Sequence, residues 1–490
     1  MYNPRVPAFE PVIGLEVHAE LQTLSKMFCA CPVVDSTSAE PNTNVCEVCT
    51  GMPGTLPVLN ARAVEYAVRV ALALGCRIAE NSVFARKNYF YPDLPKGYQI
   101  SQYELPLATA GTLTIHTDSG DKLIRIRRVH LEEDTGKLTH RQDASLVDYN
   151  RSGVPLLEIV SEPDLSSLED VKAYATSLRT LLRYLGVTSG DMEKGVIRFE
   201  ANVSVRPAGS STLGTRTEIK NLNSFRSMLR ALTCEVERQS ALLEAGRQVR
   251  QETLGWDDAQ GVTVPQRGKE EAHDYRYFPE PDLPPLQLEQ GWIRAVESQL
   301  PELPEARRQR FLHFGLAPRT VDLLVAERPV ADFFEAALAA RPSSAAPLAN
   351  WMTGEVFGLL NQHSVTIDAA RLTPASLAEL VGLLEMETIN LPTAKGLLAR
   401  LFEQGGSPAE IVRSQGLGQV SDSTAIDEFV AQVLRDSPEQ VRQYLGGKPA
   451  IRQWLFGQVM RLAKGRANPS LVEQRLLAGL EALAESRPSL

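Results

Sequence analysis

Polar and apolar residues alternate along three segments in the first half of the chain. Between residues 12 and 21 the odd positions are apolar, whereas the even positions include Glu16 and His18. Residues 196–206 and 216–220 alternate in the same way. Successive side chains of a β-strand point to opposite faces, so each segment predicts a strand with one apolar and one polar face. Such strands suit an antiparallel sheet that is covered on one face and open on the other.

Helical periodicity indicates how the rest of the chain is organised. Residues 60–75 and 222–246 have the pattern of amphipathic helices, and beyond about residue 290 Leu and Ala recur at helical spacing with almost no strand signal. Prolines gather just before this change, and Gly405-Gly406-Ser407-Pro408 breaks the helical part. The pattern predicts an α+β protein with an antiparallel-sheet domain at 1–290, an all-α helical domain at 291–405 and a small helical tail domain at 406–490.

Composition narrows the class of protein. A chain of 490 residues is long enough for several domains. Its net charge of -9 argues against a surface that coats nucleic acid uniformly. There is no apolar run of membrane-spanning length and no signal-peptide pattern at the start of the chain, so we expect a cytoplasmic protein with no membrane as a partner.

Four of the six cysteines are clustered near the start of the chain. Cys29-x-Cys31 is followed, after 14 residues, by Cys46-x-x-Cys49. Two close pairs of thiols suit a tetrahedral zinc ion, and a site filled by four sulfur ligands is structural rather than catalytic. The alternative is four unliganded thiols, and the C-x-C spacing of the first pair leaves it open.

Acids and one histidine populate the polar faces of the predicted strands. The set consists of Glu16, His18, Glu132, Glu133, Asp134, Glu158 and Glu200. Carboxylates with an imidazole suit a divalent cation such as Mg²⁺, which in turn binds phosphate oxygens. Basic residues accompany them, as expected if an anionic substrate is bound beside the metal: Arg125, Arg127, Arg128, Lys137, Arg141 and Arg151. The alternative is an ordinary solvated sheet face.

The tail holds the one concentrated basic stretch of this acidic sequence. Between residues 441 and 471 there are six bases and no acid: Arg442, Lys448, Arg452, Arg461, Lys464 and Arg466. A local phosphate-binding surface and a helix with scattered cations explain this charge equally well.

Several longer motifs resemble one family. They are Val12-Ile-Gly-Leu-Glu-Val-His18, Arg86-Lys-Asn-Tyr-Phe-Tyr-Pro-Asp93, His130-Leu-Glu-Glu-Asp134, Ser161-Glu-Pro-Asp164, Lys220-Asn-Leu-Asn-Ser-Phe225 and Asp274-Tyr-Arg-Tyr-Phe-Pro-Glu-Pro-Asp282. They resemble the B subunit of the aspartyl/glutamyl-tRNA amidotransferase. The tail segments Gly457-Gln-Val-Met460 and Lys464-Gly-Arg-Ala-Asn-Pro469 resemble the YqeY-like tail domain of the same protein family.

The resemblance implies a ligase subunit that uses ATP and Mg²⁺ to phosphorylate the side-chain carboxylate of mischarged Glu-tRNA(Gln), Asp-tRNA(Asn) or both. Ammonia from a glutaminase A subunit then displaces the phosphate, and a small C subunit completes a heterotrimer. The chain shows no glutaminase motif of its own, in keeping with that division.

The resemblance also assigns roles to residues. It makes 1–290 the catalytic cradle domain, with Glu16, His18, Glu133 and Glu158 as catalytic residues and the last three as Mg²⁺ ligands. Zinc at the cysteines is then structural. The tail is expected to bind tRNA through Lys448, Arg452, Arg461, Lys464 and Arg466. The rival interpretation is a non-catalytic tRNA-binding scaffold, in which the acids are ordinary surface residues.

Overall fold

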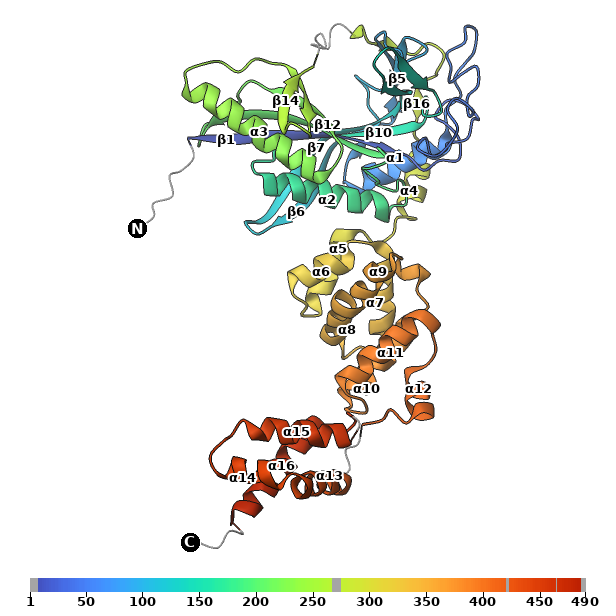
Figure 1. Ribbon diagram of the computed structural model, residues 1–490. Coiled ribbons are helices and arrows are strands. Elements are labelled where there is room, and N and C mark those ends of the chain that lie inside the picture. The colour runs from blue at the N-terminus through green and yellow to red at the C-terminus, as the bar shows by residue number, and fades with distance from the viewer. Residues whose placement is uncertain (1–7, 267–274, 420–422, 464, 486–490) are drawn as a thin grey trace. The chain divides into compact units, whose positions relative to one another are not determined.

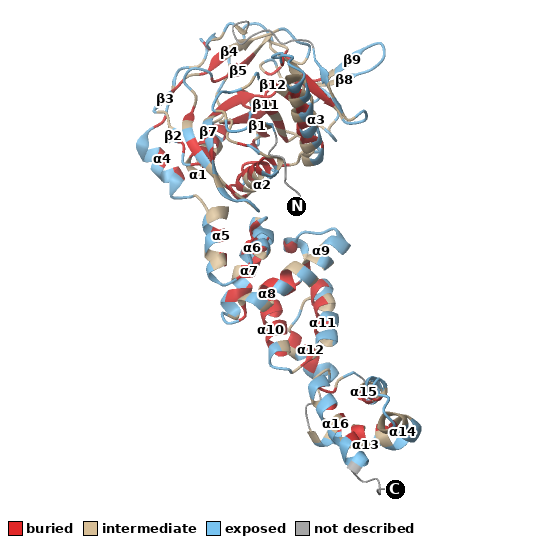
Figure 2. Ribbon diagram, turned by 90° about the vertical axis from the view of Figure 1, so that its left-hand side faces the viewer, coloured by how far each residue is buried: buried red, intermediate tan, exposed pale blue. Residues whose placement is uncertain are grey.

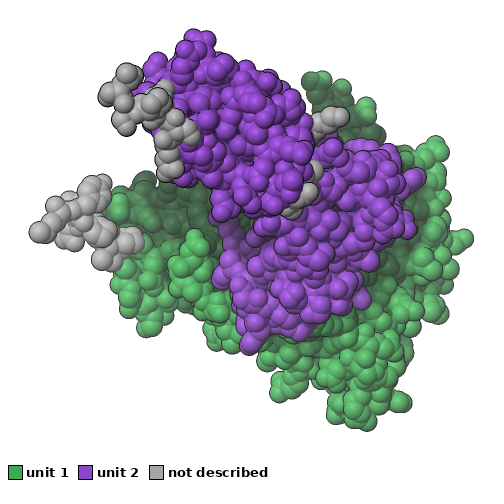
Figure 3. Space-filling model, turned by 90° about the horizontal axis from the view of Figure 1, so that it is seen from below, with its two compact units in different colours: residues 1–306 green, residues 307–490 purple. Residues whose placement is uncertain are grey.

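The computed structural model describes residues 8–266, 275–419, 423–463 and 465–485. Its fold is mixed α+β: a large sheet domain precedes helical domains, as the sequence predicts (Figure 1). The chain divides into two compact units, with the boundary between Ala306 and Arg307 (Figure 3). The predicted domain limits at 290/291 and 405/406 stay predictions.

The largest element of the first unit is a sheet that has nine strands in the described residues. Its order is β14-β13-β12-β11-β1-β10-β7-β6-β2. All neighbours are antiparallel except β12 and β13, which run parallel. The strands are β1 (Phe9–Glu20), β2 (Arg77–Ile78), β6 (Ala108–Thr117), β7 (Gly120–Glu133), β10 (Pro155–Ser161), β11 (Ile197–Pro207), β12 (Thr217–Leu222), β13 (Thr253–Asp257) and β14 (Val262–Pro265).

One face of this sheet is apolar and covered by helices. Ile13, Leu15 and Val17 of β1 are fully buried there, as the alternation predicts. The covering helices are α1 (Ala61–Ala73), α2 (Leu168–Tyr184) and α3 (Phe225–Glu244), and α4 (Gln290–Glu297) packs on α1. Figure 2 shows their buried sides turned toward the sheet. Asn60 caps α1 through its side chain and Ser224 caps α3, so both predicted helices begin at a polar capping residue.

Shorter strands add a second layer near β7. β4 (Ala85–Asn88) pairs with β5 (Tyr98–Ser101) and β15 (Phe278–Pro279), β3 (Asn81–Ser82) pairs with β16 (Leu286–Gln287), and β8 (Lys137–His140) pairs with β9 (Ser145–Asp148). In the proline-rich segment 278–285, Phe278 and Pro279 form the paired strand β15, and β16 follows directly after the last proline. Edge strands tolerate proline because one side of their backbone has no ladder bonds to lose.

The second unit is helical throughout its described residues and contains two separate apolar cores. The first core includes Phe311, Phe334 and Leu401, and the second includes Ile426, Leu455 and Leu476. The helices from the unit boundary onward are α5 (Pro304–His313), α6 (Pro318–Val325), α7 (Arg328–Ala340), α8 (Ala345–Trp351), α9 (Phe357–His363), α10 (Pro374–Glu385), α11 (Leu391–Gln404), α12 (Pro408–Gln415), α13 (Ser423–Asp436), α14 (Pro438–Leu445), α15 (Ile451–Leu462) and α16 (Pro469–Glu485). No helix in the described ranges is both long and apolar enough to cross a lipid bilayer.

Candidate metal and phosphoryl-transfer site

A row of charged side chains crosses the polar face of the large sheet. His18 of β1 lies opposite Arg198 of β11 on one side and Glu158 of β10 on the other, and Glu158 lies opposite His130 of β7. Directly opposed residues in an antiparallel pair project from the same face, so the strand register alone brings these four groups together.

Three ligand groups converge in this row: His18, Glu132 and Glu158. The Nε2 atom of His18 lies 3.6 Å from Glu158 Oε2 and 4.0 Å from Glu132 Oε2. Both glutamates are nearly buried. One imidazole and two carboxylates form a donor set that fits a divalent cation, and their buried charges favour binding one.

A second histidine holds the two glutamates together. His130 Nε2 lies 3.0 Å from Glu158 Oε2 and 3.3 Å from Glu132 Oε1. Burial alone would lower the pKa of His130, but the charge of Glu158 and the contacts with Glu132 outweigh burial and raise that pKa to about 9. His18 follows the same logic, because Glu158 raises its pKa against the effect of burial. In return, the two imidazoles hold the pKa of Glu158 well below its usual range, although burial opposes this.

The structure places Glu133 apart from this group. Lys96 Nζ lies 2.6 Å from both carboxylate oxygens of Glu133, and the Ile100 N–H donates to Glu133 Oε1 at 2.9 Å. Glu132 is instead held from β5 by Ser101 Oγ at 2.6 Å and Gln99 Nε2 at 3.1 Å. Adjacent residues of a strand point to opposite sides, so Glu132 faces the cation group and Glu133 faces away from it.

Glu133 lies in a separate cavity of about 280 Å³. Its other charged walls are Arg86, Lys96 and Asp282, and the loop that carries Cys49 closes one side. Arg86 is anchored there by both carboxylate oxygens of Glu280, at 2.7 and 2.8 Å.

Glu16 belongs to a neighbouring carboxylate group with Glu200 and Glu218. Asn202 donates to Glu16 Oε1 at 2.8 Å, and Lys220 forms ion pairs with both Glu200 and Glu218. Burial, followed by the charges of Glu158 and Glu200, raises the pKa of Glu16. Glu16 therefore lies beside the His18 group rather than in it.

Several of the arginines expected to bind an anion are paired with acids of the chain itself. Arg125 forms bidentate contacts with Asp164, and Arg127 forms them with Glu162. Arg151 donates to the backbone oxygens of Thr135 and Gly136.

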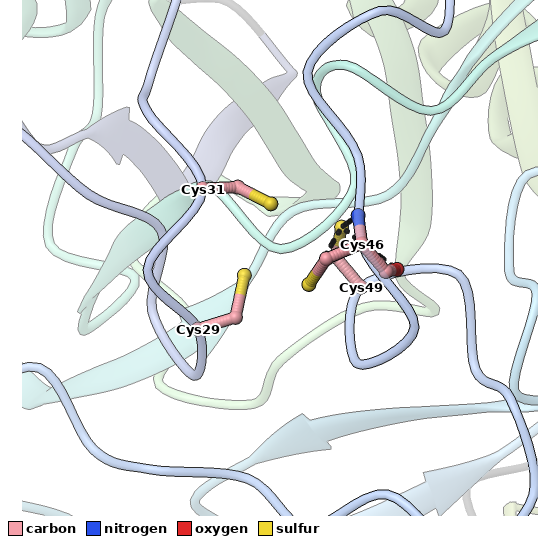
Figure 4. Close-up of side chains that lie close together, drawn as sticks. All are labelled: Cys29, Cys31, Cys46 and Cys49. Atoms are coloured by element: carbon pink, nitrogen blue, oxygen red, sulfur yellow. Dashed lines mark hydrogen bonds between the residues drawn. The ribbon is translucent and has the colours of Figure 1, made fainter.

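The four clustered cysteines come together from two loops. Their sulfur atoms all lie within 4.8 Å of one another, and Figure 4 shows the two pairs facing each other. Cys49 also receives a contact from the buried Lys26, whose Nζ lies 3.5 Å from its sulfur. The hydrogen bond with Cys29 lowers the pKa of Cys49 although burial opposes this, and the same bond raises the pKa of Cys29, so one thiolate of the cluster is favoured.

The basic residues predicted in the tail do not form one group. Arg452 and Arg461 are nine residues apart on α15, which is two and a half helical turns, so they project from opposite sides of the helix. Arg466 donates to the backbone oxygen of Gly416 at 2.7 Å. Lys448 precedes α15 in an exposed turn, and Lys464 lies outside the described residues.

Sequence reasoning assigned no role to His130, Gln99 or Ser101. His130 had a signal, because it shares the alternation of β7 with Glu132. Gln99 and Ser101 had none, since only the pairing of β5 beside β7 brings them to the site.

The sequence of the sheet domain matches the model of a family of catalytic domains. The family model described as the GatB/GatE catalytic domain matches residues 11–294, and the one described as the GatB domain matches residues 332–480.

Full-length relatives specify the family. The chain is 51% identical over 467 residues to the B subunit of the aspartyl/glutamyl-tRNA(Asn/Gln) amidotransferase of Oleidesulfovibrio alaskensis, covering 95% of this chain and 98% of the relative. It is 50% identical over 473 residues to the protein of the same name from Moorella thermoacetica (96% and 99% covered) and 50% identical over 474 residues to that from Myxococcus xanthus (96% and 98% covered). The chain belongs to the family of aspartyl/glutamyl-tRNA(Asn/Gln) amidotransferase B subunits.

Proposed function

We propose that this chain is the amide-forming subunit of a tRNA-dependent amidotransferase. Its substrate is the side-chain carboxylate of Glu-tRNA(Gln), Asp-tRNA(Asn) or both. ATP phosphorylates this carboxylate, and ammonia supplied by a glutaminase A subunit replaces the phosphate; a small C subunit completes the heterotrimer. The names of the full-length relatives support the reaction. The observation that supports its location is the group of the half-buried His18 and the buried Glu132 and Glu158, which lies within the residues matched by the catalytic-domain model.

His18, Glu132 and Glu158 would hold Mg²⁺, which supplies charge stabilisation for phosphoryl oxygens when bound. Neighbouring residues of the chain hold these ligand side chains in position. Ser101, Gln99 and His130 fix the orientation of Glu132, and the sheet register fixes His18 opposite Glu158. Cys29, Cys31, Cys46 and Cys49 would hold a structural zinc ion.

The tail is the proposed contact with the body of the tRNA. Lys448 is exposed there, Arg452 forms an ion pair with Glu473 and Arg461 contacts Gln458, whereas Arg466 donates to the backbone oxygen of Gly416. The cytoplasmic location stays a prediction from the sequence.

The test uses the assembled enzyme with its partner subunits, charged Glu-tRNA(Gln) and Asp-tRNA(Asn), and γ-labelled ATP. We expect His18→Ala to abolish phosphorylation of the charged tRNA while glutaminase activity and tRNA binding persist. His140→Ala, in the exposed β8–β9 hairpin, is the matched control. Unchanged phosphorylation in His18→Ala would support the non-catalytic scaffold instead.

A further inference from the structure

Lys87 projects toward the proposed cation group from the second layer of strands. It lies on β4 directly opposite Gln99 of β5, and Ala85 lies opposite Ser101. Cross-strand partners share a face, and both Gln99 and Ser101 donate hydrogen bonds to Glu132 from this face. Arg86, the neighbour of Lys87, points the other way and lines the cavity of Glu133. The small sheet therefore directs Lys87 toward the cation group.

Two tyrosine rings lie against the ammonium group of Lys87. Its Nζ lies 5.1 Å from the ring centre of Tyr275 and 6.0 Å from that of Tyr89, both within cation–π range. Tyr277, next to these rings, stacks on Tyr103 at 4.1 Å with nearly parallel rings. The rings restrain the lysine side chain but use none of its three N–H donors for an ordinary hydrogen bond.

The positive charge of Lys87 is balanced by the carboxylates of Glu132 and Glu158 without direct contact. No hydrogen bond or ion pair joins its Nζ to another residue in the described part of the chain. Burial lowers the pKa of Lys87, but the charge of Glu132, and to a lesser extent that of Glu158, outweighs burial and raises it. The ammonium group of Lys87 therefore has unused N–H donors and lies near carboxylates that suit a metal ion. This arrangement suits an anion that contacts both the metal ion and Lys87.

We propose that Lys87 is a catalytic residue that donates hydrogen bonds to the oxygens of the phosphoryl group transferred from ATP to the aminoacyl carboxylate. This inference rests on the proposed function. In the step concerned, a carboxylate oxygen forms a bond to the γ-phosphorus, the bond from that phosphorus to the β,γ-bridging oxygen breaks, and ADP leaves with its electron pair. Negative charge is spread over the three peripheral oxygens of the phosphoryl group, and the ammonium of Lys87 stabilises it without transferring a proton.

A purely structural role makes different predictions. If Lys87 only neutralised Glu132 and Glu158, its loss would leave excess negative charge that a divalent cation compensates. The Lys87→Met variant would then bind Mn²⁺ more tightly and would phosphorylate normally once metal is saturating. If Lys87 contacts the phosphoryl group, the rate stays low at saturating metal, because metal cannot replace the missing donor.

The experiment measures single-turnover phosphorylation of charged tRNA from γ-labelled ATP in the assembled enzyme, with glutamine and ammonia withheld and with saturating Mg²⁺ and ATP. Mn²⁺ affinity is measured on the same proteins by electron paramagnetic resonance. We expect Lys87→Met to lower the rate by about 100-fold or more, the usual effect of deleting one donor to a charged transition state. Lys87→Arg should recover part of this loss.

Lys194→Met is the matched control, because Lys194 is an exposed lysine that forms an ion pair with Asp35 at the surface. If Lys87→Met does not fold, Lys87→Gln is judged by the same criteria. A rate within about threefold of the unmutated enzyme at saturating metal would overturn the proposal. If the unmutated enzyme itself transfers no phosphoryl group to charged tRNA, the proposed function fails instead, so the two failures are distinguishable.

Discussion

Glu132 and Glu133 are adjacent in sequence, yet the structure predicts opposite consequences when each is changed to Gln. Glu132→Gln removes one of two carboxylates from the cation group. Loss of a residue that only hydrogen-bonds to a metal ligand typically weakens metal binding 10–100-fold. We therefore expect the loss of a charged ligand to weaken Mn²⁺ binding by about 100-fold, or about 2.7 kcal/mol.

Glu133→Gln should leave Mn²⁺ affinity nearly unchanged and destabilise the fold. The Glu133 side chain is 3% exposed and that of its partner Lys96 is 13% exposed. Removing one member of a buried ion pair strands the other charge and costs about 3–5 kcal/mol. The Gln side chain keeps an acceptor for the Ile100 N–H, so the lower figure, about 3 kcal/mol, applies. For a unit of 306 residues, an unfolding entropy of about 2.1 cal/mol/K per residue makes this a decrease in Tm of roughly 5 °C.

Both quantities are measured on the same full-length proteins: Mn²⁺ affinity by electron paramagnetic resonance and Tm by scanning calorimetry. Glu193→Gln, at an exposed surface position, is the control for removal of a charge alone. The reasoning is refuted if Glu133→Gln loses the cation while Glu132→Gln retains it. That result would restore the ligand set implied by the family resemblance.

Three further predictions concern the zinc loop, pH and the tail. Metal analysis should find one zinc ion per unmutated chain and none in Cys46→Ser; equal, near-zero zinc in both would remove the zinc site. In metal-free protein, the pKa of His130 is about 9 in the folded state against 6.5 in the unfolded state, so protonated His130 stabilises the fold by roughly 3 kcal/mol. This contribution is complete below pH 6.5 and is lost as the pH rises through 9; denaturant unfolding that shows constant stability over this range contradicts the assignment. A chain that ends at Gln419 keeps Ile411 and Val412, which belong to the first core of the second unit. The enzyme assembled with this shortened chain should have a higher KM for charged tRNA and unchanged glutaminase activity; an unchanged KM would exclude the tail from tRNA binding.

The sequence predicted the large sheet because its strands have one buried face. Leu15 and Val17 cannot change places with Glu16 and His18 without a register shift that would bury charge, so period-two alternation identifies both the strands and their polar face. The pattern also placed His18 and Glu158 on polar positions. Which strands pair with which is a long-range property, and the alternation does not encode it.

The same limit explains why the sequence could not separate the positions of Glu132 and Glu133. Two adjacent acids at the end of a strand must point to opposite sides, but nothing local says which side holds the cation group. Pairing of β10 with β7 decides this by setting Glu158 opposite His130, two residues before Glu132. The proposed role of Lys87 was hidden for the same reason, since Tyr275 and Tyr277, two of the tyrosines near it, lie about 190 residues further along the chain.

The positions of Glu132 and Glu133 on different sides of β5 also determine which site the loss of zinc should affect. The cysteine loop is fastened to the segment before β10: Ser152 donates to the Cys49 backbone oxygen at 3.0 Å, and Lys26 bridges the Cys49 sulfur and the Tyr149 oxygen. That loop forms a wall of the Glu133 cavity, on the side of β5 away from Glu132. Loss of zinc should therefore loosen this cavity and the start of β10 before it disturbs His18 or Glu132. The expected consequence is a lower thermal stability with the cation affinity largely retained, because a structural metal on one side of a strand does not supply ligands to the other.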